Sequence, residues 1–540
     1  MESVKKLFVC CAGRRSLPSI PTTAENPNTT EARQGAFEKL QIWCSSQVAQ
    51  YSAGVIQLSA EAEDSGQPTT HSVLETSNSK SHFNNSTGSD SDDSSWEEEL
   101  YRWGPFQDIP DSSFAPLAAG AFYQDEQGAP FVVESRVHGA HSFVVILSNG
   151  PSKLAVKIPI VGTKDRWNPK HKPILVSEAD TIQWVRDQVP HFPVAEVLDW
   201  DTTLDNDIGA PYSCWSFIQG KSANAIWWDS DDEEETEGGE SKANTDNDWI
   251  DDPSEECEQR RHTFLLSLAR TMAELRHVSM DAIGMLELEG DSFDEPTINP
   301  IYTYIGAGPL ECRSYREMPV FRTASAFWQE KLERVYYAAH NPYSQGLRFV
   351  LELIVNSPPF VCSKASPHDE EESFTLYHPD LALQNILVAD DGKILGILDW
   401  EGAFFAPRCV GHICLPAWLQ EGWLPVASDI PAGEIRNLSK YREIYTNAMI
   451  EACGGPESDA KYTMKSGLYA SVVYTLFSNF GPSSHDKTDK LVKTLFRKIP
   501  ALCDASEETL EEFIEKVGNG SLEGRKILEW IPKLIDHRTS

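Results

Sequence analysis

Residues 377–388 read YHPDLALQNILV, and residues 397–401 read ILDWE. Between these two segments lies the sequence ADDG at 389–392, and Asp-Gly is a strong signal for a β-hairpin turn. The apolar, β-branched residues on both sides of this turn predict the two strands of the hairpin. The stretch therefore predicts a short hairpin that has polar residues at its open end.

Three polar side chains are expected at this open end. A hairpin brings the start of its first strand beside the end of its second, so Asn385 and Asp399 should face each other, and Asp380 lies in the loop that leads to them. Amide and carboxylate oxygens suit Mg²⁺, and a separate Asp can accept a hydroxyl proton. We predict that Asn385 and Asp399 bind Mg²⁺ and that Asp380 is the base of an ATP-dependent phosphoryl transfer. Any one of these residues, taken alone, could equally be an ordinary turn residue.

The whole pattern, from His378 through Asn385 to the Asp-Trp-Glu sequence at 399–401, resembles the aminoglycoside phosphotransferase (APH) family in its fungal-type branch. The resemblance covers about residues 97–540. It implies an α+β, protein-kinase-like fold of two lobes. The N-terminal lobe would hold a five-stranded antiparallel sheet with one helix, and the C-terminal lobe would be mainly helical. The resemblance also implies that His378 braces the catalytic loop.

The upstream region predicts the sheet of the first lobe. Strands are expected at 131–134, 143–147, 153–158, 197–200 and 212–217. The third strand contains Ala155-Val156-Lys157, which resembles the strand motif that carries the nucleotide-binding lysine. Glu178 follows on an amphipathic helix, and we predict that it pairs with Lys157 and positions it for the phosphates. Taken alone, both residues could be solvated charges.

Two further nucleotide contacts are predicted from main-chain groups. The loop after the first strand has a single glycine, Gly139, and lacks the G-x-G-x-x-G pattern. It is therefore only a weak indication of a phosphate-binding loop. Backbone amides near Gly139 are still expected to cover the phosphates. The segment that holds Ser216, Phe217 and Ile218 is expected to be the hinge between the lobes and to hold adenine.

Composition divides the 540 residues into four parts. We expect a largely disordered polar region at 1–96, a nucleotide-binding lobe at 97–220, an acidic disordered insertion at 221–259, and a helical lobe with the catalytic loop and acceptor site at 260–540. The net charge is −36, and residues 229–258 alone hold fifteen acidic residues against one lysine. This run is either a solvated loop or an acidic lip that attracts a cationic acceptor. The acidic balance argues against nucleic-acid binding.

The sequence contains no apolar run long enough for a membrane helix, so no membrane contact is expected. Its eleven cysteines form no C-x-x-C pair, which argues against a zinc site and a disulfide framework. A cytoplasmic location is the simplest interpretation.

These patterns predict an enzyme that transfers the γ-phosphoryl group of ATP to a hydroxyl of a small molecule. Two alternatives stay open: a catalytically idle, kinase-like binding or scaffold protein, and, less favoured, a protein kinase. The Asp-Trp-Glu motif and the lack of an A-P-E-like segment after Asp399 count against the protein kinase. The sequence predicts neither the identity of the acceptor nor the oligomeric state.

Overall fold

The computed structural model describes eight ranges of the chain: 100–123, 129–228, 253–288, 296–305, 314–334, 341–420, 437–477 and 482–538. All of them belong to one compact unit, Asp93–Ser540. The region 1–96, which we predicted to be largely disordered, lies outside the described residues.

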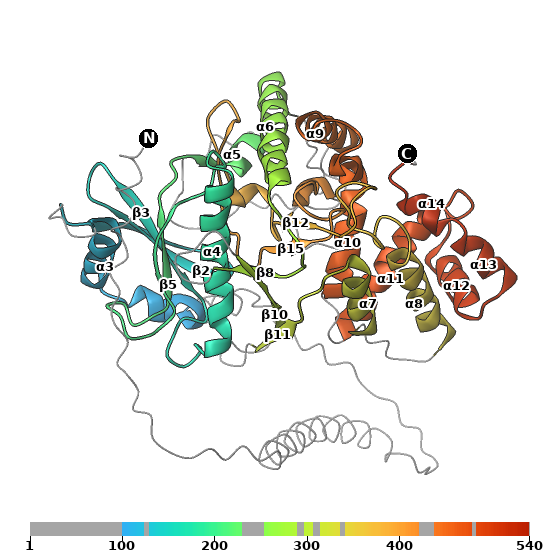
Figure 1. The fold of residues 1–540 in the computed structure, drawn as a ribbon, viewed down its shortest axis with the longest axis horizontal. Coiled ribbons are helices and arrows are strands. Elements are labelled where there is room, and N and C mark those ends of the chain that lie inside the picture. The colour runs from blue at the N-terminus through green and yellow to red at the C-terminus, as the bar shows by residue number, and fades with distance from the viewer. Residues whose placement is uncertain are drawn as a thin grey trace, which may run out of the picture. The chain divides into compact units, whose positions relative to one another are not determined.

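The first lobe is built on an antiparallel sheet of five strands (Figure 1). Its strands are β1 (Val132–His138), β2 (Ser142–Ser148), β3 (Lys153–Pro159), β4 (Val197–Asp201) and β5 (Tyr212–Ser216), in the order β1-β2-β3-β5-β4. Buried and half-buried side chains alternate along β2 and β3, as expected for strands with one covered face. The predicted five-stranded sheet is confirmed.

The first lobe has more helix than the sequence analysis predicted. The expected helix is α4 (Lys172–Gln188), and residues 100–107 and α3 (Asp111–Tyr123) are also helical. Trp103, Phe106 and Phe114 are buried in the same apolar cluster as the inward side chains of β2 and β3. These extra helices therefore cover a face of the sheet and remove its apolar surface from water.

Both ends of the predicted acidic insertion, 221–259, are ordered, so these boundaries were wrong. After the hinge come β6 (Lys221–Ser222) and α5 (Ala223–Trp227), and α6 (Glu255–Ala273) begins four residues earlier than the predicted end of the insertion. Ser254 caps α6, and acidic residues in its first turn favour the positive end of the helix dipole. Charges that suggested a solvated loop thus help to start a helix. Residues 229–252 lie outside the described residues.

The second lobe is mainly helical, as predicted. Its remaining helices are η2 (Glu274–His277), α7 (Ala324–Arg334), α8 (Pro342–Val355), η4 (Leu383–Asn385), η5 (Ala417–Gln420), α9 (Leu438–Ala452), η6 (Asp459–Lys465), α10 (Ser466–Phe477), α11 (Pro482–Arg497), α12 (Glu507–Gly518), α13 (Leu522–Leu528) and α14 (Ile531–Ile535). Its strands are β7 (Ser279–Met280), β8 (Met285–Glu287), β9 (Thr297–Asn299), β10 (Ile301–Ile305), β11 (Ser314–Met318), β12 (Phe374–Tyr377), β13 (Ile386–Val388), β14 (Ile394–Ile397) and β15 (Phe404–Ala406). None of the helices in the described ranges is long and apolar enough to cross a lipid bilayer.

The predicted hairpin is formed by β13 and β14. Ile386 pairs with Ile397, and the Leu398 amide donates to the carbonyl of Asn385 at 2.8 Å, which extends the ladder to the open end. Gly392 occupies the turn with a φ of +85°, and an added Cβ there would lie 2.8 Å from the carbonyl oxygen of Arg260 on α6. A glycine is therefore needed both for the left-handed backbone and for the close approach to α6.

Short strands of the second lobe also hold α4, a feature that the sequence analysis did not predict. Asp180 on α4 accepts a hydrogen bond of 2.9 Å from the amide of Leu288, directly after β8. Tyr315 on β11 packs edge-on against His171, just before α4, with ring centroids 4.8 Å apart. The position of α4, and with it that of Glu178, is therefore determined by both lobes.

Candidate active site

The loop that leads into the hairpin is held by His378, which is buried. Its Nδ1 accepts a hydrogen bond of 3.1 Å from the Asp380 amide, so Nε2 carries the proton and donates to the carbonyl of Leu398 at 3.0 Å. Burial lowers the pKa of His378, which keeps the ring neutral in this role. His378 thereby ties the start of the loop to the segment that carries Asp399.

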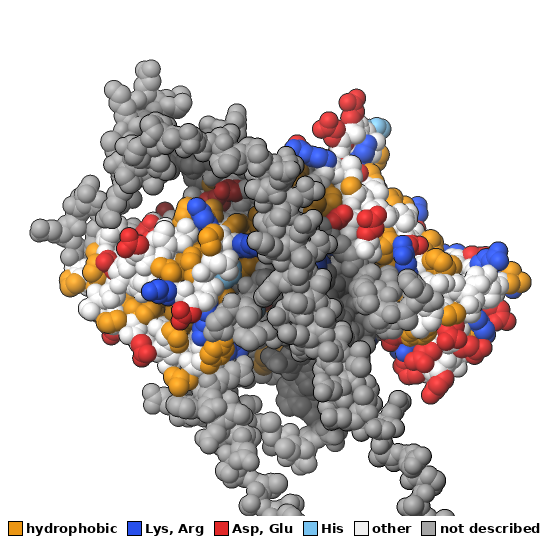
Figure 2. Space-filling model, turned by 90° about the horizontal axis from the view of Figure 1, so that it is seen from below, with side chains coloured by type: hydrophobic (Ala, Val, Ile, Leu, Met, Phe, Trp, Pro, Cys, Tyr) orange, Lys and Arg blue, Asp and Glu red, His pale blue; other side chains and the backbone are white. Residues whose placement is uncertain are grey.

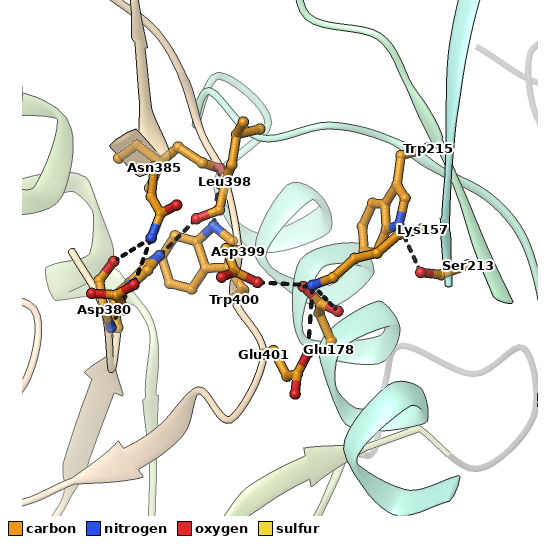
Figure 3. Close-up of polar contacts among 12 residues, drawn as sticks. Lys157, Glu178, Ser213, Trp215, Asp380, Asn385, Leu398, Asp399, Trp400 and Glu401 are labelled. Atoms are coloured by element: carbon orange, nitrogen blue, oxygen red, sulfur yellow. Dashed lines mark hydrogen bonds and ion pairs between the residues drawn. The ribbon is translucent and has the colours of Figure 1, made fainter. Parts of the chain in front are cut away.

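Asp380 and Asn385 are in direct contact (Figure 3). The Asn385 Nδ2 donates to the main-chain carbonyl and to Oδ2 of Asp380, both at 2.9 Å. This arrangement leaves Oδ1 of Asn385 without a hydrogen-bond partner in the described part of the chain. The amide group therefore orients the Asp380 carboxylate and retains an oxygen for a further ligand.

Asp399 has a left-handed backbone, with φ at +60°. Asp is one of the few residues besides glycine that adopts this region readily, and such backbones concentrate at functional sites. The turn directs the carboxylate across the gap between the lobes, where Oδ1 lies 2.8 Å from Lys157 Nζ.

Lys157 is surrounded by three carboxylates (Figure 3). Its Nζ lies 2.8 Å and 3.0 Å from the two carboxylate oxygens of Glu178, 2.8 Å from Asp399 and 3.7 Å from Glu401. Burial opposes the positive charge, but the carboxylates outweigh it and hold the pKa of Lys157 well above its ordinary value. Lys157 therefore stays protonated, and three carboxylates surround its ammonium group.

Asp380 and Asp399 open onto one cavity of about 410 Å³. His141 lines it from the first lobe, and Glu401, Leu415 and other residues line it from the second. The volume falls in the range of small-molecule sites. The cavity therefore places the carboxylates of Asp380 and Asp399 beside a space of the size of a small molecule.

The main-chain groups predicted to bind the nucleotide differ in their surroundings. The Gly139 amide donates to the Ser142 carbonyl at 2.9 Å within the β1–β2 turn, so this amide is already used. The Ser216 and Phe217 amides are used as well, at 2.9 Å and 3.3 Å. By contrast, Ile218 makes no backbone hydrogen bond within the described residues. All of these nucleotide contacts stay predictions.

The structure thus brings together Lys157 with Glu178 and Asp399, and Asp380 with Asn385. The sequence analysis gave no role to Glu401, although it belongs to the quoted Asp-Trp-Glu motif. The sequence signal for Glu401 is its position two residues after Asp399. The backbone turns at Asp399, which has a left-handed conformation, and Glu401 then lies 3.7 Å from Lys157 Nζ.

Most of the acidic run at 229–258, predicted to be either a solvated loop or an acidic lip, lies outside the described residues. Figure 2 shows acidic side chains gathered at the end of the molecule that holds the C-terminal helices.

A five-stranded lobe, a helical lobe and a lysine–carboxylate cluster between them make up a kinase-like fold. Residues 135–410 match the model of the phosphotransferase enzyme family (APH), and the chain belongs to this family. The resemblance noted from the catalytic loop is confirmed.

Two curated relatives come from two strains of Aspergillus fumigatus, and both are named subtelomeric hrmA-associated cluster proteins. Each is 25% identical over 297 residues, which is 49% of this chain and 56% of the relative. The chain therefore matches only about half of the length of these relatives.

Solved structures with a similar fold include one described as an aminoglycoside phosphotransferase from Ralstonia eutropha. It is 11% identical, covers 78% of this chain and 98% of its own, and has a TM-score of 0.37. The aminoglycoside phosphotransferase APH(4)-Ia is 14% identical, with coverages of 71% and 99% and a TM-score of 0.35. Family membership rests on the matched segment, not on these low scores.

Proposed function

We propose that this protein transfers the γ-phosphoryl group of ATP to a hydroxyl of a small molecule. The observation that supports this most strongly is the bridge from Lys157 Nζ to Glu178 and Asp399, each at 2.8 Å, beside a cavity that also exposes Asp380. Phosphoryl transfer needs positioning and charge stabilisation more than covalent chemistry, and this set of groups can supply both.

The residues present fit a magnesium ion. Asn385 Oδ1 has no hydrogen-bond partner in the described chain, and only Oδ1 of Asp399 is paired. Both are hard oxygens of the kind that Mg²⁺ prefers. The three carboxylates around Lys157 would repel a polyphosphate, so a divalent cation is needed to offset them. When bound, the ion would neutralise charge on the phosphates.

The chain's own groups have distinct tasks in this proposal. Lys157, held by Glu178, binds phosphate oxygens. Asp380 orients the acceptor hydroxyl and takes its proton, while Asn385 holds the carboxylate in place. His378 keeps the loop in position through its two main-chain hydrogen bonds.

The hinge supports a place for the adenine ring. Because Ile218 makes no backbone hydrogen bond within the described residues, its amide and carbonyl are available to the polar edge of a purine. We propose Ile218 as the main adenine contact, since the neighbouring amides are already used.

The test is a screen of hydroxyl-bearing metabolites with Mg²⁺ and labelled ATP, read by mass spectrometry. We expect at least one metabolite to gain a single phosphate with the wild-type protein and none to gain it with Asp380→Asn. If nucleotide binds but no acceptor in a broad panel is phosphorylated, the idle, kinase-like alternative replaces this function.

A further inference from the structure

The cavity beside Asp380 extends away from the reacting groups into the second lobe. Beyond the catalytic loop its walls include Met272 of α6, Leu415, and Ala470 and Tyr474 of α10. Among its described lining residues, the only carboxylates are Asp380, Asp399 and Glu401, which all lie at the reacting end. Among the described lining residues, the far part of the cavity combines apolar side chains with the polar groups of His412, Gln420 and Tyr474, and it holds no carboxylate.

One polar side chain in this far part has no protein partner. His412 lines the cavity and is 1% exposed, and neither of its ring nitrogens has a hydrogen-bond partner within the described residues. A buried polar group that stays unpaired destabilises the folded state, because it has lost its hydrogen bonds to water. Such a group is expected to be paired by a bound molecule.

The His412 ring is neutral. Burial, together with the nearby positive charges of Arg408 and Arg276, lowers its pKa to about 3. A neutral imidazole has one N–H donor and one acceptor nitrogen.

The position of His412 is set by its backbone. Gly411 lies so close to Thr375 on β12 that an added Cβ would collide with the threonine side chain. The segment is therefore packed directly on the central strand, which fixes the position of His412.

We propose that this cavity accepts a neutral, mainly apolar alcohol as the phosphoryl acceptor, and that His412 pairs with a second polar group of that molecule. This inference rests on the phosphotransfer proposed above. In that reaction the acceptor oxygen forms a bond to the γ-phosphorus, the bond to the β-phosphate oxygen breaks, the hydroxyl proton goes to Asp380, and ADP leaves. A polycationic acceptor is disfavoured.

The probes are neutral bicyclic and aromatic alcohols with a second hydroxyl or carbonyl group. Each is paired with an analogue that carries an ammonium group in place of that second group. Binding is read by the thermal shift of the full chain with Mg²⁺ and ADP, and transfer by mass spectrometry with Mg²⁺ and ATP. We expect the neutral member of a pair to bind and to be phosphorylated in preference to its ammonium analogue.

Variants of His412 test the pairing. His412→Phe fills a similar volume without a donor or acceptor, and we expect it to raise the KM for a neutral alcohol about tenfold or more, with the KM for ATP unchanged. His412→Gln keeps one donor and one acceptor and should restore part of the affinity. Melting curves of both variants exclude a folding defect as the cause.

The experiments distinguish the proposed ligand of the cavity from the proposed phosphotransfer. Alcohol binding that follows this pattern without transfer would support the assignment of the cavity and contradict the phosphotransfer. Preferential binding or phosphorylation of the ammonium analogues, no binding of any alcohol, or an unchanged KM for the alcohol in His412→Phe would overturn the inference.

Discussion

Lys157 and Asp399 lie 242 positions apart in the sequence, yet Nζ of one and Oδ1 of the other are 2.8 Å apart. The contact joins the sheet of the first lobe to the hairpin of the second. Glu178 and Glu401 complete the surround of the lysine. One cation thus balances charges that come from both lobes, and this relationship decides how several variants should behave.

Removal of Lys157 should destabilise the fold. Lys157→Met leaves Glu178, whose side chain is 7% exposed, without its cation, and a broken buried pair costs about 3 kcal/mol. The Glu178 carboxylate would hold a proton in the native state that the unfolded chain releases, so the loss should be larger at about pH 8 than at about pH 5. Urea denaturation at both pH values measures it.

The matched control is Lys153→Met on the same strand. Lys153 pairs with Glu134 at 2.7 Å, but both side chains are more than a third exposed, so the change should stay within about 0.5 kcal/mol. Equal effects of the two substitutions would contradict the special role of Lys157.

The Asp399 carboxylate should determine the requirement for Mg²⁺. Asn tolerates the left-handed backbone at this position, so Asp399→Asn should fold normally but bind nucleotide only at higher Mg²⁺ concentrations. A titration of Mg²⁺ at fixed ATP, followed by thermal shift, measures the change. Asp390→Asn in the hairpin turn, where the side chain is 88% exposed, is the control and should leave the titration unchanged.

His378 should affect turnover through the position of the loop. His378→Phe retains an aromatic ring against Trp400, whose centroid lies 4.5 Å away, but removes both main-chain hydrogen bonds. We expect kcat to fall about tenfold or more, because small displacements of a reacting group are costly. The exposed His368→Phe serves as a control, and an unchanged kcat in His378→Phe would exclude the bracing role.

Asp180 should make stability depend on pH. Burial raises its pKa to about 6, although the hydrogen bond from Leu288 opposes the shift. The native state therefore binds more protons than the unfolded state between about pH 4 and pH 6, and stability falls as pH rises through this window.

Asp180→Asn removes this charge but keeps an acceptor oxygen for Leu288. We expect the variant to be more stable than the wild type above about pH 6, by on the order of 1–3 kcal/mol, and equally stable near about pH 4. Denaturation curves across this range measure the difference, with the exposed Asp187→Asn on the same helix as control. A parallel shift at all pH values would contradict the assignment.

The sequence was most informative where local signals and spacing agree. Asp-Gly fixed the turn of the β13–β14 hairpin, and the placement of Asn385 and Asp399 followed from strand pairing alone. The five strands were predictable because apolar alternation and turn residues mark each of them. The pairing of Lys157 with Glu178 needed the resemblance to a family as well, since neither residue is distinctive alone.

Other features depend on contacts that no local pattern encodes. The contacts of β8 and β11 with α4 are made by single pairs of residues that lie far apart in the sequence. One of them is the hydrogen bond from the Leu288 amide to Asp180. His412 appears in the sequence as one histidine among fourteen, and only its burial and unpaired nitrogens distinguish it. The acidic start of α6 was predicted to belong to a disordered loop, because the same charges suit a solvated loop and a helix N-terminus.

The most direct test of the central claim is a comparison of Asp380→Asn with the wild type in two assays on the same preparation. The account predicts that phosphate transfer to an acceptor identified in the screen disappears, while the affinity for ATP with Mg²⁺ stays close to that of the wild type, because Asp380 acts on the acceptor and not on the nucleotide. Turnover at the wild-type rate in Asp380→Asn would contradict the account.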